Sequence, residues 1–137
     1  MNRLAKVDYP EAFKGKYVRV HWEFENDLKV ILERSGQKEN FRQKYRQRLQ
    51  HLSDRRQECI KKRDWFEKLT YEKDLYSMKI KGEKNIRIIF TFVAYKGSEY
   101  AILLYPFEEK DSKNKGKHSY DTAKPIAQKR LQEVLIR

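Results

Sequence analysis

The chain has 137 residues and a net charge of +12, with 39% hydrophobic and 13% aromatic residues. This length predicts a single domain, and the apolar and aromatic content excludes a disordered basic tail. No apolar run approaches membrane-spanning length and no signal peptide opens the chain, so we expect a cytoplasmic protein without a membrane partner. The excess of basic residues favours a polyanion partner, most often nucleic acid, although solubility alone is an alternative.

Several classes of chemistry lack the residues that they need. The single cysteine, Cys59, excludes an internal disulfide, and it is typical of a small residue at the edge of a core. The three histidines, His21, His51 and His118, are scattered. There is no zinc-ligand spacing, nucleophile elbow or glycine-rich phosphate loop. The sequence therefore predicts neither a metal site nor a cofactor.

The first part of the chain predicts an extension, a strand and a short helix. Residues 1–16 mix charges with proline and glycine, and we expect this N-terminal extension to pack on the domain or to help bind a partner. Residues 17–24 alternate as a strand does. Asn26 or Asp27 can cap a helix that ends near Gly36, a residue suited to the left-handed terminal position.

Residues 38–63 form the longest helical stretch. The apolar stripe of this helix comprises Phe41, Tyr45, Leu49, Leu52 and Cys59. The other faces are basic and include Arg55 and Arg56. They predict either a contact face for nucleic acid or a partner protein, or an ordinary solvated surface. After the helix, Trp65, Phe66 and Leu69 are expected to close the core.

Residues 75–81, 86–93 and 100–107 predict three strands joined by two hairpins, since turn-forming residues separate them. In the first strand, alternation places Tyr76, Met78 and Ile80 toward the core and Ser77, Lys79 and Lys81 on an exposed face. The third strand is apolar at nearly every position, as expected of a central strand covered on both faces. Pro106 is expected to end its pairing.

A charged loop, residues 108–119, contains Lys110, Lys113, Lys115, Lys117 and His118. Asp121 or Thr122 can cap a final helix. The element order predicts one α+β domain over residues 1–137. Its mainly antiparallel four-stranded sheet would pack against two N-terminal helices and a C-terminal helix.

The polar face of the sheet suggests a phosphate site. If the loop folds over this face, six side chains converge there: Lys79, Lys81, Arg87, Lys117, His118 and Tyr120. Such a set could bind an RNA phosphodiester, while a lysine crowded by cations could deprotonate the 2′-hydroxyl and a tyrosine could stack on a base. The ordinary alternatives are solvated lysines, a packing tyrosine and an incidental histidine.

The three strands, the lysine-rich loop and the terminal helix with Ala123, Ala127 and Arg130 resemble the RelE/HigB-type toxins of bacterial toxin–antitoxin modules. The resemblance covers about residues 65–135. It implies a compact RelE-like α+β fold and a ribosome-dependent endoribonuclease that cuts mRNA without a metal. It also implies an antitoxin protein as partner.

Residue roles follow from this resemblance by position. It implies that Lys79 is the general base, that Lys81 and Arg87 stabilise the phosphate, that Lys117 is the loop cation and that Tyr120 stacks on or orients the base. His118 is similar to the C-terminal histidine of some relatives. Lys81 stands in place of an arginine and loses bidentate contact. Lys110, Lys113 and Lys115 compete with Lys117, and with Arg55 and Arg56 they are the expected RNA-binding residues.

Two other functions remain open. A ParE-like relative would have the same fold and would bind DNA gyrase without ribonuclease chemistry. A plain nucleic-acid-binding protein would use helix 38–63 as its basic face and would show steeply salt-dependent binding.

Overall fold

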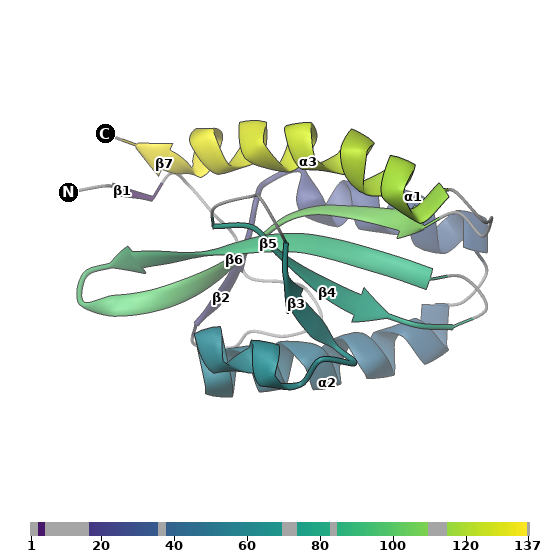
Figure 1. Cartoon of the computed structure of the whole chain (residues 1–137), viewed down its shortest axis with the longest axis horizontal. Coiled ribbons are helices and arrows are strands. Elements are labelled where there is room, and N and C mark those ends of the chain that lie inside the picture. Colours follow the sequence, from purple (N-terminus) through teal and green to yellow (C-terminus); the bar gives the residue numbers. More distant parts are fainter. Residues whose placement is uncertain are drawn as a thin grey trace.

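The computed structural model describes residues 3–4, 17–35, 38–69, 74–82, 85–109 and 115–136 (Figure 1). The elements are β1 (Arg3–Leu4), β2 (Val18–Val20), α1 (Phe24–Ser35), α2 (Lys38–Arg55), a 3₁₀ helix (Arg56–Lys61), β3 (Phe66–Lys68), β4 (Tyr76–Ile80), β5 (Asn85–Tyr95), β6 (Ser98–Glu109), α3 (Lys115–Val134) and β7 (Leu135–Ile136). Among these residues, no helix is both long and apolar enough to cross a membrane.

The main sheet has five strands in the order β2-β6-β5-β4-β3. Strand β2 runs parallel to β6 and the other neighbours are antiparallel. The α+β prediction is thus confirmed, whereas the predicted four-stranded sheet lacked β3. This strand has three residues, Phe66–Lys68, which is too short for alternation to be visible in the sequence. Separately, β1 pairs with β7, so part of the N-terminal extension contacts the C-terminal end.

The hairpin between β5 and β6 follows the prediction. Its turn residues Lys96 and Gly97 have φ angles of 50° and 79°. Positive φ at both central positions gives the turn whose twist matches the flanking strands.

The expectation for Pro106 was wrong, because β6 continues to Glu109 and Pro106 pairs with Ile88. At that point only β5, among the described strands, lies beside β6, and a strand tolerates proline where its nitrogen faces no second neighbour.

One face of the sheet is covered by α1 and α2. The predicted apolar stripe of the long helix is buried, and it packs with Met78, Ile88 and Phe90 in one core cluster. The helix itself is shorter than predicted. It ends at Arg55 because Arg56 has a φ of 49°, which an α-helix cannot contain, and the chain continues as a 3₁₀ helix.

The opposite face is covered by α3, which lies across the sheet from α2 in Figure 1. Ala123 and Ala127 of α3 pack with Ile89, Ile102 and Leu104. The central strand β6 is therefore covered on both faces, as predicted. The face that carries Ser77 and Lys79 was predicted to be exposed, and this was wrong, because the apolar side of α3 needs a surface to bury against.

Two element boundaries also differ. The last helix begins at Lys115, ahead of the predicted cap at Asp121 or Thr122, so residues 115–119 are helical instead of belonging to the predicted loop. The predicted strand 17–24 is limited to Val18–Val20, and α1 begins at Phe24. The chain turns there because His21 accepts a hydrogen bond from the Glu23 amide, which no continuous strand would make.

Candidate functional site

The strand register brings polar side chains together beneath the first turns of α3. Glu67 pairs with Ser77, and Lys79 pairs with Arg87. Directly opposed residues in neighbouring strands share a face of the sheet. Tyr120, from α3, contacts this same face through Ser77. We call the five residues Glu67, Ser77, Lys79, Arg87 and Tyr120 the polar cluster.

Tyr120 is fixed at the centre of the polar cluster. Its hydroxyl lies 2.8 Å from Ser77 Oγ and 3.4 Å from Glu67 Oε1. The edge of its ring contacts Phe107, with centroids 5.1 Å apart. Burial raises the pKa of Tyr120 to about 12, against the opposing effects of the Ser77 hydrogen bond and the Arg87 charge. The hydroxyl is therefore protonated at neutral pH and can donate a hydrogen bond.

Lys79 lies beside a carboxylate. Its ammonium is 3.7 Å from Glu67 Oε2 and donates to the Arg63 carbonyl at 3.2 Å, and about a fifth of the side chain is exposed, 21%. This environment differs from the cation-crowded one that was expected for a lysine base. The Glu67 carboxylate and the Arg63 carbonyl hold the ammonium in place, so the geometry suits Lys79 to electrostatic stabilisation.

Arg87 has an unused hydrogen-bond donor. Its Nε donates to Glu109 Oε2 at 2.6 Å, which anchors the guanidinium. Its Nη1 is buried and has no hydrogen-bond partner within the part of the chain that the structure describes. An unpaired buried donor is costly, and a bound anion such as a phosphate oxygen would satisfy it.

The remaining predicted residues are not all part of this cluster. Lys81 is exposed beyond the end of β4, where its carbonyl accepts a hydrogen bond from Lys44 Nζ at 2.5 Å. Lys115, Lys117 and His118 belong to the first turns of α3, the helix that carries Tyr120. Their side chains, and the whole of Lys110 and Lys113, lie outside the described residues.

Arg55 and Arg56 lie away from the polar cluster. They stand at the end of α2, which covers the opposite face of the sheet. The Arg56 guanidinium lies 3.7 Å from the centre of the Tyr17 ring, whereas Arg55 is exposed.

Three residues that contribute to the candidate site were not predicted from the sequence. Glu67 was missed because its short strand was not predicted, and Glu109 because it was assigned to a loop. The role of Ser77 could have been found, since it shares a strand face with Lys79.

No group of three or more His, Cys, Asp or Glu side chains is placed to hold a metal ion within the described ranges. No family model, no curated protein and no solved structure matches this chain.

Proposed function

We propose that the protein is a metal-independent endoribonuclease and the toxin component of a type II toxin–antitoxin module. The observation that carries this proposal is the meeting of Lys79, Arg87 and Tyr120 on one face of the sheet, with Arg87 Nη1 buried and without a hydrogen-bond partner among the described residues. The resemblance to RelE/HigB-type toxins supplies the substrate class, mRNA on the ribosome, and the partner, a cognate antitoxin. The site of action would be the cytoplasm.

RNA carries its own nucleophile, so the site needs only acid–base groups and cations. In the proposed reaction, the 2′-oxygen attacks phosphorus and gives its proton to Glu67. The bond from phosphorus to the 5′-oxygen breaks, and the leaving oxygen takes a proton from Tyr120. The products are a 2′,3′-cyclic phosphate and a 5′-hydroxyl end. Arg87 Nη1 and the Lys79 ammonium stabilise the charge on the non-bridging oxygens.

This scheme changes the role that the resemblance implies for Lys79. The Glu67 carboxylate lies 3.7 Å from the Lys79 ammonium and accepts a hydrogen bond from the Tyr120 hydroxyl, so it already contacts the two other groups of the proposed reaction. We therefore assign proton acceptance to Glu67 and retain Lys79 as an essential cation.

The test is induced expression of the wild type and of Lys79→Ala in a bacterial host, with primer extension on cellular mRNA. We expect the wild type to arrest growth and cut mRNA, and Lys79→Ala to do neither. Lys68→Ala is the matched control, because Lys68 is exposed and pairs with Tyr76, on the other face of the sheet. Equal toxicity of Lys79→Ala and the wild type would refute the proposal.

A non-catalytic nucleic-acid-binding protein is the second candidate. It is favoured by the carboxylates beside both cations, Glu67 with Lys79 and Glu109 with Arg87, which hold positive charge in place without requiring chemistry. Intact mRNA and unaffected growth in the same experiment would select it. A DNA damage response without mRNA cleavage would select the ParE-like activity.

A further inference from the structure

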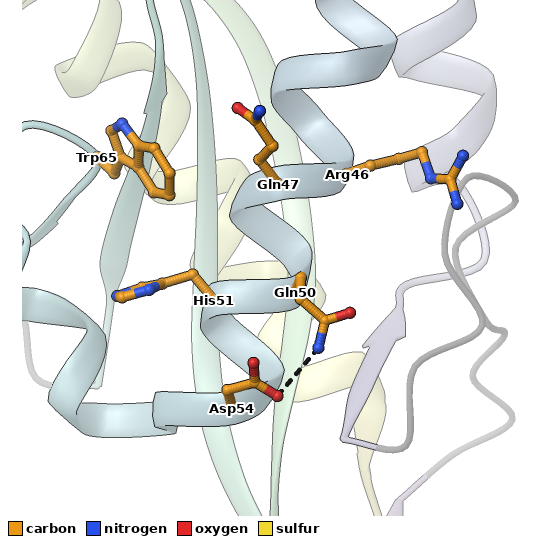
Figure 2. A pocket seen from close by; sticks show the side chains of 6 residues that line it. All are labelled: Arg46, Gln47, Gln50, His51, Asp54 and Trp65. Atoms are coloured by element: carbon orange, nitrogen blue, oxygen red, sulfur yellow. Dashed lines mark hydrogen bonds between the residues drawn. The ribbon is translucent and has the colours of Figure 1, made fainter.

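A groove lies on the outer side of α2, around the edge of the sheet from the polar cluster. It is lined by Arg46, Gln47, Gln50, His51, Asp54 and Trp65 (Figure 2). Its volume is about 630 Å³, and it is shallow and largely open to solvent. None of these residues has a part in the proposed reaction.

The base of the groove is aromatic. His51 contacts the Trp65 ring edge-on and stacks on Phe66, with centroids 5.7 Å apart in both pairs. The buried Arg48 guanidinium lies 4.5 Å from the centre of the Trp65 ring, and its Nε donates to the Lys79 carbonyl at 2.7 Å. The indole is therefore held in a fixed position, which reduces the entropy that is lost when a ligand stacks on it.

The polar rim offers both amides and cations. Gln47 and Gln50 lie on successive turns of α2, and amide groups can pair with the edge of a nucleobase. Asp54 is the acidic member, and Gln50 Nε2 donates to its Oδ1 at 3.0 Å. Exposed Lys62 has its ammonium 4.3 Å from the centre of the Trp65 ring. Since its side chain is flexible, it can leave the ring and pair with a phosphate.

The groove and the polar cluster are physically adjacent. The Lys79 amide donates to the Trp65 carbonyl at 2.7 Å, and the Lys79 ammonium donates to the Arg63 carbonyl at 3.2 Å. Among the described strands β3 is the edge of the sheet, so none of the others separates the two sites. An extended chain could pass from one to the other around this edge.

We propose that the groove binds one unpaired nucleotide of the same single-stranded RNA whose phosphodiester lies at the polar cluster, with its base stacked on Trp65. The proposal rests on the proposed function for the identity of the strand. Base stacking on a tryptophan, amides at the base edge and cations for the phosphate are the combination by which proteins hold single-stranded RNA. An acidic peptide would use the cations but would gain nothing from the indole.

The experiment uses the fluorescence of Trp65. The chain has two tryptophans, so Trp22→Phe in the full-length protein leaves Trp65 as the only reporter. The Lys79→Ala change is added so that the protein can be produced. A short single-stranded RNA with 2′-O-methyl groups is titrated in, because it cannot be cleaved. We expect saturable quenching, and no quenching by poly-glutamate of the same length.

Matched variants locate the binding. Arg46→Gln and Arg42→Gln each remove one exposed positive charge from α2, but only Arg46 lines the groove. We expect Arg46→Gln, combined with Gln47→Ala, to weaken RNA binding at least about fivefold, and Arg42→Gln to weaken it less than about twofold at equal salt. Equal effects of the two would overturn the proposal, as would equal quenching by poly-glutamate or none by RNA.

The result of the groove experiment can be distinguished from the result of the mRNA-cleavage experiment that tests the proposed function. If the wild type cuts mRNA in cells but Trp65 does not respond to RNA, the groove proposal fails and the endoribonuclease remains. If Trp65 responds specifically but mRNA stays intact, the groove binds RNA and the cleavage proposal fails. Trp65→Leu, followed through labelled RNA and checked for folding, should reproduce the loss seen with the groove variants.

Discussion

The Tyr120 hydroxyl lies 2.8 Å from Ser77 Oγ and so links the first turns of α3 to the middle of β4. Ser77 is fully buried at this contact. The pair holds the tyrosine above the face that carries Lys79 and Arg87, and it makes the position of Tyr120 independent of substrate.

Tyr120→Phe tests the hydroxyl without removing the ring. The ring contact with Phe107 should persist, so we expect stability to fall by about 1–3 kcal/mol, the cost of leaving buried Ser77 without this hydrogen bond. Cleavage should fall by roughly 10- to 100-fold if the hydroxyl donates to the leaving oxygen. Primer extension at equal protein level measures this, and Ser77→Ala should cause a smaller loss. An unchanged rate would remove Tyr120 from the reaction.

Glu67→Gln distinguishes two proton acceptors. With Glu67 as the base, we expect Glu67→Gln to lose cleavage at every pH. With Lys79 as the base, Glu67→Gln would retain activity. Cleavage of purified ribosome-bound mRNA by the variant, measured over a range of pH, decides between them.

Arg87→Lys tests the buried unpaired donor. Lysine can still reach Glu109, but it cannot present the second nitrogen of the guanidinium to a phosphate oxygen. We expect a folded protein whose binding of uncleavable RNA is weakened about tenfold, with little change in thermal melting. A variant with normal RNA binding would show that Arg87 is purely structural.

Tyr45→Phe should leave the protein as stable or make it more stable. The Tyr45 hydroxyl is buried and has no hydrogen-bond partner over the ranges that the structure covers, and burial raises its pKa well above the ordinary value. Removing an unsatisfied hydroxyl eliminates a desolvation cost of about 1–3 kcal/mol. Urea unfolding measures the change, and the ring still stacks on Phe41. Destabilisation by more than about 1 kcal/mol would show that the Tyr45 hydroxyl does make a hydrogen bond in the folded protein.

His21 should make stability depend on pH. Burial, aided by the charge of Arg130, lowers its pKa against the opposing effect of the Glu133 hydrogen bond. The unfolded chain therefore takes up a proton near pH 6.5, before the folded protein does. As pH falls from about 6.5 toward the lower folded pKa, the free energy of unfolding should decrease.

The measurement for His21 is urea unfolding at pH 7.5 and pH 5.5, for the wild type and His21→Gln. The variant should lose part of the pH dependence, because glutamine can replace the contacts of the imidazole with Glu133 and the Glu23 amide without titrating. His51→Gln is the companion variant, since burial and Lys62 also lower the pKa of His51. If the free energy of unfolding of His21→Gln depends on pH as it does in the wild type, the dependence arises from a group other than His21.

The sequence by itself determined the α+β class, the buried stripe of α2 and the three central strands, because hydrophobic periodicity is a local property. It also placed Lys79 and Arg87 on one face of neighbouring strands. Only the tertiary structure decided that α3 covers this face and that Glu67 and Glu109 stand beside the two cations. Those contacts join residues far apart in the chain, and a three-residue edge strand shows no alternation by which its neighbours could be predicted.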